Sequence, residues 1–383
     1  MTRAVLSALL LPLLILPESA IAQVPEAQEV PAEAPTSVSL SRSAVMEVPA
    51  GQKVRRIAPD GAVVTSRWGS GAVTFTLHDP KSGRSTELPF STSVSKSDYE
   101  RVTEVRVDGP YVSFTDVRDP DFAIYDRKTG EVRRLTHPVG GRIDDVSVSL
   151  QTGDVLYERR EGPVTKPRVY LWRRGESEPT LISNTDTYTP QWAPNGDFFL
   201  LRKRMSVQKA GKDDDGSYLY WWIYSSDGKP LLDLSRYGRT SEADWSPDSK
   251  KIALDVRSNR LGLFILYLGE NGHSIEVERA RYIAPPTDEA FFAPKWSPDG
   301  SRLAYIVEHI GDMGGARMEL RVLKDRNGTY QRYSAGVGSA STFWASPPWE
   351  WASPTTLNVA GGNASRTGSP SSGQQITRIM IDF

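Results

Sequence analysis

The sequence contains four histidines and no cysteine, and this limits the chemistry that its side chains can perform. The histidines are far apart in the chain, and each is near an expected turn or loop: His78, His137, His273 and His309. Two of them could meet in space as metal ligands, but solvated loop histidines are the simpler interpretation. The lack of cysteine removes thiolate ligands, thiolate nucleophiles and disulfides. We therefore predict no metal site and no cofactor.

Carboxylates are concentrated in a long insertion, residues 202–217, where Asp213, Asp214 and Asp215 precede Gly216. Calcium loops place their ligands at alternate positions, whereas adjacent carboxylates diverge, so a solvated loop tip is favoured over a cation site. Long loops on a rigid scaffold often carry binding residues. Two of these carboxylates, Asp213 and Asp215, are therefore candidate binding residues.

Aromatic side chains gather in two segments. The first, residues 218–224, places rings on both faces of one strand, and burial between neighbouring sheets explains most of it. The second is Pro-rich and contains Trp344 and Trp349, which are harder to bury. We add both tryptophans to the candidate binding residues, together with Tyr218 and with Arg317, which ends the Gly-rich segment 309–317.

These candidates are carried by a repeated unit. Three copies begin at Trp192-Ala-Pro-Asn-Gly, Trp245-Ser-Pro-Asp-Ser and Trp296-Ser-Pro-Asp-Gly, spaced 53 and 51 residues apart. Each copy continues into an apolar, β-branched strand. Proline, Asp or Asn, and glycine in this order favour a tight hairpin turn. A second hairpin follows in each unit, so a unit contains four short strands.

Weaker copies near residues 57–68, 105, 148 and 351 bring the number of unit starts to seven. Repeated four-stranded units predict an all-β fold, a β-propeller with four-stranded blades. We expect seven blades, with residues 37–40 and 44–48 completing the last one. Six blades remain the alternative if the first or last unit is partial.

The N-terminus predicts export. A basic Arg3 and an apolar stretch over residues 4–16 precede the small residues Ala20 and Ala22. This pattern is typical of a cleaved signal peptide over residues 1–22 with a mature start at Gln23, and an uncleaved anchor is the alternative. No later segment has the ~18 consecutive apolar residues that a membrane-spanning helix needs.

The remaining chain divides into two parts. Residues 23–36 are rich in Pro, Ala and Glu, and we predict that they form a disordered leader. Residues 37–383 are expected to form a single propeller domain. The 46 basic and 47 acidic residues nearly balance, which argues against a nucleic-acid partner. The oligomeric state stays open.

The unit Trp-Ser-Pro-Asp-Gly, followed by an apolar strand and later by a strand that ends in Leu-Thr, resembles the WD-like repeat of TolB-type propellers. The same repeat occurs in the propellers of prolyl-oligopeptidase relatives. The resemblance covers most of the mature chain and is strongest over residues 189–307. It implies the fold and little about function. The α/β domain of TolB and the Gly-x-Ser-x-Gly elbow of the peptidases have no counterpart here.

We therefore expect a periplasmic or secreted, TolB-like propeller that binds a protein or peptide and acts as a scaffold in the bacterial cell envelope. A carbohydrate-active or lactone-cleaving enzyme is the alternative, because residues from several blades can converge in the central channel of a propeller. A regulatory subunit with a small-molecule ligand is a third possibility. The lack of a recognisable catalytic constellation favours binding over catalysis.

Overall fold

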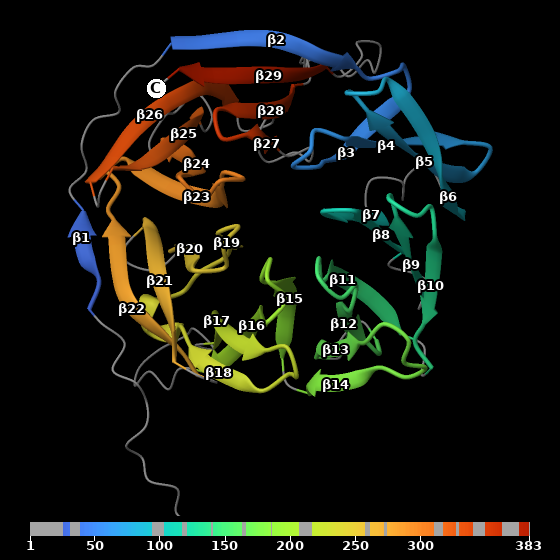
Figure 1. Cartoon of the computed structure of the whole chain (residues 1–383), viewed down its shortest axis with the longest axis horizontal. Coiled ribbons are helices and arrows are strands. Elements are labelled where there is room, and N and C mark those ends of the chain that lie inside the picture. The colour runs from blue at the N-terminus through green and yellow to red at the C-terminus, as the bar shows by residue number, and fades with distance from the viewer. Residues whose placement is uncertain are drawn as a thin grey trace, which may run out of the picture.

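The computed structural model describes most of the propeller domain and a short part of the leader. The described residues are 26–30, 39–93, 103–116, 121–138, 141–162, 166–184, 186–206, 217–256, 261–271, 274–309, 317–326, 329–339, 349–361 and 375–382. They form seven sheets arranged in a closed ring (Figure 1). The protein is a seven-bladed β-propeller, which confirms the predicted fold and excludes the six-bladed alternative.

The strands of each blade follow one another from the centre of the ring outward, and neighbouring strands are antiparallel. Blade 1 contains β3 (Gln52–Ile57), β4 (Val63–Gly69), β5 (Ala72–Asp79) and β6 (Arg84–Ser93), and blade 2 contains β7 (Thr103–Asp108), β8 (Tyr111–Asp116), β9 (Asp121–Asp126) and β10 (Val132–Thr136). Blade 3 contains β11 (Arg142–Val148), β12 (Val155–Arg160), β13 (Arg168–Trp172) and β14 (Thr180–Ser183). Blade 4 contains β15 (Thr187–Trp192), β16 (Phe198–Ser206), β17 (Ser217–Ser225) and β18 (Pro230–Asp233).

Blade 5 contains β19 (Ala243–Trp245), β20 (Lys251–Asp255), β21 (Leu263–Asn271) and β22 (Ser274–Ile283). Blade 6 contains β23 (Glu289–Trp296), β24 (Arg302–His309), β25 (Arg317–Arg326) and β26 (Thr329–Ser339). A short 3-10 helix, η2 (Ser235–Tyr237), precedes blade 5. Blade 7 contains β27 (Trp349–Ser353), β28 (Thr356–Gly361), β29 (Gln375–Asp382) and, as its outermost strand, β2 (Ser39–Glu47). The antiparallel pairing of β2 with β29 is the predicted seam that closes the ring.

The Ser-Pro-Asp-Gly units form the turns between the first and second strands. In blade 6 the Ser297 hydroxyl donates to Asp299 at 2.6 Å, and Gly300 closes the turn with a φ of 68°. A left-handed φ of this kind favours glycine. These turns lie on one face of the ring, the turn face, because the strands alternate in direction. The connections between second and third strands lie on the opposite face, the loop face.

The core lies between the blades, as the aromatic pattern of the sequence predicted. Trp221 of β17 and Trp351 of β27 are among the largest fully buried side chains. Neighbouring blades also exchange hydrogen bonds near the axis, where the Trp296 amide donates to the Asp244 carboxylate at 2.7 Å and the Val148 amide donates to Asp108 at 3.0 Å. The blades are therefore joined by both apolar packing and directional polar contacts.

The leader differs from the prediction. Residues Gln28–Val30 form strand β1, which pairs in parallel with β22, so blade 5 has five strands. The predicted disorder is wrong for these residues. Val30 and Ala27 are partly buried against the blade 5 core, and this contact offsets the entropy of ordering so short a strand. Within the described residues, no helix is long and apolar enough to cross a membrane.

Candidate functional site

The central channel is lined by ionic side chains that pair with one another across blades. Arg106 of β7 contacts Asp145 of β11 at 2.7 Å, and Lys295 of β23 contacts Glu350 of β27 at 2.5 Å. Burial of the Asp244 carboxyl away from water raises its pKa to about 7. Since the Asp244 carboxylate accepts the Trp296 amide, we assign it a structural role. No group of three or more potential metal-ligating side chains occurs within the described ranges.

Two histidines lie in the interior. His78 of β5 is 7% exposed, with its ring nitrogens 2.8 Å from the hydroxyls of Thr65 and Ser85. His137 packs edge-on against Tyr170, and burial lowers its pKa to about 4. The expectation of solvated loop histidines is therefore wrong for both. His273 lies outside the described residues.

The fourth histidine belongs to a buried ionic cluster in blade 6 that sequence analysis missed. Arg321 of β25 donates to both carboxylate oxygens of Glu289, at 2.5 and 2.6 Å, and to Glu319 at 2.8 Å. His309 lies 3.4 Å from Glu319. These carboxylates raise the pKa of Arg321. Because one guanidinium serves both carboxylates, the cluster is suited to fixing the strands of blade 6 rather than to binding a cation.

The loop face of blades 3 and 4 carries a group of cationic and aromatic side chains, which we call the basic–aromatic surface: Arg142, Arg160, Lys166, Arg168, Tyr188 and Arg204. Arg142 and Arg160 both pair with Asp144, whereas Lys166 and Arg204 both pair with Asp186. Lys166 lies just before β13, and the other residues stand near the ends of β11, β12, β13, β15 and β16, where the alternating strand directions bring them to one face.

Three ion pairs of this surface are asymmetric in exposure, whereas Arg168 and its partner Glu161 are 41% and 40% exposed. The cationic side chains are open to solvent, with Arg142 52% exposed, Arg204 41% and Lys166 74%. Their carboxylate partners are mostly covered, with Asp144 12% exposed and Asp186 14%. At these three pairs the surface presents positive charge outward, while the neutralising carboxylates lie beneath it.

Aromatic rings are interleaved with the cations. The guanidinium groups of Arg160 and Arg204 lie 5.6 and 5.8 Å from the centroid of the Tyr188 ring. At the loop end of β17, the Arg239 guanidinium lies 5.2 Å from the Tyr218 ring. Stacking of this kind holds a guanidinium in place and leaves its N–H groups able to bind an anion.

A titratable carboxyl lies under the surface. Glu158 of β12 is almost fully buried, accepts the Thr189 amide at 3.2 Å and pairs with Arg160 at 3.1 Å. Burial and the nearby Asp145 carboxylate raise the pKa of Glu158 to about 7. Thr189 has a φ of 52°, which is uncommon for a β-branched residue, and the hydrogen bond to Glu158 helps to hold this conformation.

Of the six predicted binding residues, the structure brings Tyr218 to this region. Trp344, Asp213 and Asp215 lie outside the described residues, and only the backbone of Arg317 is described, at the start of β25. Trp349 is 3% exposed and packs in the core of blades 6 and 7, so the expectation that it is hard to bury is wrong. Its binding role stays a prediction, and its burial weighs against that role.

Two basic segments of the sequence mark the surface. Arg159-Arg160 ends one apolar strand, and Arg202-Lys203-Arg204 continues another. Basic residues at corresponding strand ends of successive repeat units must project on the same face of a propeller. That signal was available once the repeat had been aligned.

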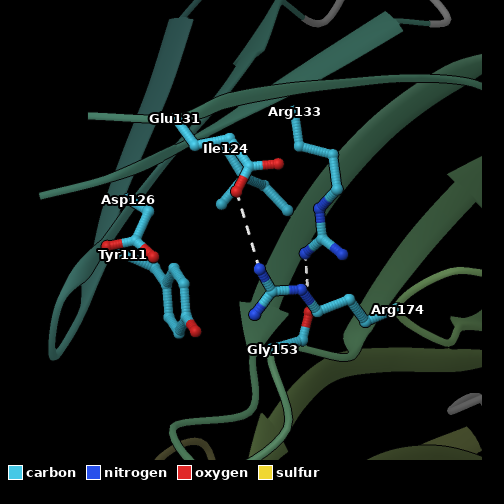
Figure 2. Close-up of a pocket in the computed structure, with 7 residues that line it drawn as sticks. All are labelled: Tyr111, Ile124, Asp126, Glu131, Arg133, Gly153 and Arg174. Atoms are coloured by element: carbon cyan, nitrogen blue, oxygen red, sulfur yellow. Dashed lines mark hydrogen bonds and ion pairs between the residues drawn. The ribbon is translucent and has the colours of Figure 1, made fainter. Parts of the chain in front are cut away.

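A small pocket on the turn face is a poor candidate site (Figure 2). It lies between blades 2 and 3 beside Tyr111, and its volume of about 20 Å³ holds little more than a water molecule. Arg133 donates to the Gly153 carbonyl at 2.6 Å, and Arg174 pairs with Glu131 at 3.5 Å. Both guanidinium groups are thus already engaged within the protein.

No protein-family model and no curated protein matches the sequence. Solved structures do match. An oligogalacturonate lyase from Vibrio parahaemolyticus aligns with a TM-score of 0.57 and 11% identity, over 91% of this chain and 98% of that one. The propeller domain of Cps50 (Swd1) from Myceliophteria thermophila aligns with a TM-score of 0.55 and 10% identity, over 89% and 99%.

A prolyl endopeptidase aligns with a TM-score of 0.50 and 12% identity, over 91% of this chain and half of that one. TolB from Acinetobacter baumannii also matches, at 14% identity and a TM-score of 0.40. Identities this low show the fold alone. The propeller fold that the repeat implied is therefore confirmed, and function has to be argued from the surface of this chain.

Proposed function

We propose that the protein is an exported propeller that binds an acidic segment of another cell-envelope protein through the basic–aromatic surface. The proposal rests on the ion pairs of Arg142, Lys166 and Arg204, in which the cation is exposed and its carboxylate partner is mostly covered. Cations that face water above buried carboxylates can accept a second anion without breaking their existing pairs. The rigid strands beneath them hold several such cations in a fixed arrangement, which limits the entropy lost on binding.

The proposed partner is acidic and extended. Each exposed ion pair contributes only about 0.2–1 kcal/mol, so useful affinity needs several contacts at once. Arg142 of β11, Lys166 just before β13 and Arg204 of β16 together present such a set. Tyr188 and Tyr218 add apolar contact area at low entropic cost. Binding of this type should weaken as salt is added.

The test is a titration of the purified chain with a fluorescently labelled acidic peptide of alternating glutamate and tyrosine. The triple variant Arg142→Ala/Lys166→Ala/Arg204→Ala should bind roughly tenfold or more weakly, since it loses three ion pairs. The double variant Lys81→Ala/Lys128→Ala removes exposed charges from the turn face and serves as the control. Equal affinity of all three proteins for the peptide would refute the proposal. The proposal would also fail if the parent bound an unrelated polyanion as tightly as it binds the peptide.

Export is part of the proposal and rests on the N-terminal pattern. Its support is the basic, apolar and small-residue order of residues 3–22. Cell fractionation followed by N-terminal sequencing tests it directly. A mature protein that starts at Gln23 in the envelope fraction is the expected result. A full-length protein that stays in the cytoplasm would overturn it.

A polysaccharide-degrading activity is the second candidate, and Glu158 is the observation that favours it. A carboxyl with a pKa of about 7 that pairs with an arginine is a suitable general base near neutral pH. The fold is also shared with an oligogalacturonate lyase. Incubation with oligogalacturonate, with product formation followed by ultraviolet absorbance, tests this candidate. Activity that is lost in Glu158→Gln would favour catalysis over binding.

A further inference from the structure

A cleft opens on the turn face between blades 1 and 2, which are neighbours in the ring (Figure 1). Its volume of about 560 Å³ lies within the range of about 300–1,000 Å³ that is typical of small-molecule sites. Residues from segments 59–60 and 77–86 of blade 1 and from segments 109–110 and 125–128 of blade 2 line it. The cleft is therefore large enough for a ligand of the size of a monosaccharide.

The register of β5 and β6 directs side chains of blade 1 toward this cleft. Leu77 pairs with Thr86. Two positions further along β5, Asp79 pairs with Arg84, so all four side chains project from the same side of the sheet. Leu77 belongs to the apolar core that blade 1 shares with Val112 of blade 2. That side of the sheet therefore faces blade 2, and Arg84 and Thr86 line the cleft beside the core.

Arg127 joins the two walls of the cleft. Its guanidinium pairs with Asp60 of blade 1 at 2.7 Å and donates to the Gly109 carbonyl at 3.3 Å. Its backbone amide donates to the Pro110 carbonyl at 2.9 Å. Because these contacts fix Arg127 and Asp60 neutralises its charge, this arginine shapes the cleft and is engaged before any ligand binds.

Three donors in the cleft have no acceptor among the described residues. They are the side chains of Arg84, Thr86 and Tyr125, none of which forms a hydrogen bond or an ion pair there. Arg84 is exposed, and Tyr125 packs partly against the core of blades 1 and 2. Donors of this kind favour a ligand rich in acceptors, and a guanidinium favours an anionic group in particular.

Two carboxylates in the cleft retain acceptor capacity. The Asp60 oxygens accept a backbone amide at 3.1 Å and the Arg127 guanidinium at 2.7 Å. The Asp79 oxygens accept the Lys81 amide at 2.9 Å and the Ser82 hydroxyl at 2.7 Å. The hydrogen bonds from Ser82 and Lys81 lower the pKa of Asp79. Since a carboxylate oxygen can accept two hydrogen bonds, both carboxylates can also accept hydroxyl groups of a ligand.

We infer that the cleft binds a hydroxylated, monosaccharide-sized molecule that carries an anionic group. Arg84 binds the carboxylate or phosphate of this ligand, and Asp60 and Asp79 accept its hydroxyl groups. The Tyr125 ring packs against its carbon skeleton. A neutral sugar would leave Arg84 without an acceptor, and an anion without hydroxyl groups would give the two carboxylates nothing to accept. The cleft lies on the face opposite to the basic–aromatic surface and does not depend on the function proposed for that surface.

The test is isothermal titration calorimetry of the purified chain with four ligands of similar size. Glucuronate and glucose 6-phosphate carry hydroxyl groups together with an anionic group, and they distinguish a carboxylate from a phosphate. Glucose lacks the anionic group, and cyclohexanecarboxylate lacks the hydroxyl groups. At least one of the two sugar acids should bind, and glucose and cyclohexanecarboxylate should each bind roughly tenfold or more weakly than that acid.

Two variants test the assigned contacts. Arg84→Ala should weaken binding of the sugar acid by roughly tenfold or more, because it removes a charge-assisted hydrogen bond. Tyr125→Phe keeps the packed ring, loses only the hydroxyl and should weaken binding about two- to tenfold. Arg67→Ala is the matched control, because Arg67 is an exposed arginine of the same blade near the loop end of β4. It should bind the acid as the parent does.

The inference is wrong if neither sugar acid binds, or if glucose or cyclohexanecarboxylate binds as tightly as the better acid. It is also wrong if Arg84→Ala binds like the parent, or if Arg67→Ala weakens binding as much as Arg84→Ala does, since binding would then follow surface charge in general. Hydrogen exchange provides the location. The bound acid should slow exchange at the Gly109 and Arg127 amides, and slowing confined to other blades would overturn the assignment.

Discussion

Glu158 makes the stability of the propeller depend on pH in a direction that the structure fixes. A rise in its pKa from 4.5 to about 7 corresponds to about 3 kcal/mol, at 1.36 kcal/mol per pH unit. Between pH 4.5 and 7 the folded protein holds a proton on Glu158 that the unfolded chain has released. The free energy of unfolding therefore falls as the pH rises through this window, and the loss is complete above pH 7.

The substitution Glu158→Gln removes this dependence, because glutamine does not ionise. Relative to the parent, the variant should become more stable by about 3 kcal/mol between pH 4.5 and pH 8, whatever constant offset the lost contact with Arg160 introduces. Other groups contribute equally to both proteins and cancel in the difference. Urea unfolding followed by circular dichroism across this pH range measures it.

Glu161→Gln is the matched control, since Glu161 lies near the same end of blade 3 but is 40% exposed. This variant removes a carboxyl from the same blade while Glu158 stays in place. If the curves of the parent and Glu158→Gln run parallel, burial does not raise the pKa of Glu158 and the argument fails. A titration of the Glu158 carboxyl by nuclear magnetic resonance provides an independent value.

Three further predictions concern single side chains. Burial lowers the pKa of His137 to about 4, so neutral His137 stabilises the fold above pH 6.5, and this stabilisation is lost as the pH falls toward 4. In urea unfolding over this pH range, His137→Gln should therefore lose less stability than the parent does. Asp244→Ala leaves the buried Trp296 amide without its acceptor and should cost about 1–3 kcal/mol in urea unfolding, whereas Asp244→Asn should cost less. Trp351→Ala removes a ring that is 1% exposed and should cost about 3–5 kcal/mol, measured by the same method.

The fold could be predicted because its signals are local. Each Ser-Pro-Asp-Gly turn involves adjacent residues, as the bond from Ser297 to Asp299 illustrates. Repetition of that turn with apolar strands leaves few architectures other than a propeller. Even the closing seam followed from a count of strands in the last unit, and the pairing of β2 with β29 confirms it.

The ion pairs of the central channel and of the blade 6 cluster were harder to predict because they join residues that are distant in sequence. Arg106 meets Asp145 across 39 positions, and Arg321 meets Glu289 across 32. The exact register of neighbouring blades decides which side chains meet, and no local pattern encodes it. Strand β1 was missed for the same reason, since a Pro- and Glu-rich segment has little strand propensity and is ordered only by the edge on which it lies.

Net charge gave a misleading impression of the surface. The balance of 46 basic and 47 acidic residues suggested that charge does not select a partner. Burial separates the two signs, however: Asp144 and Asp186 lie beneath the cations of the loop face, whereas Glu276 and Glu278 face solvent at the rim. A chain with a formal net charge of −1 can thus present one basic and one acidic surface on different blades.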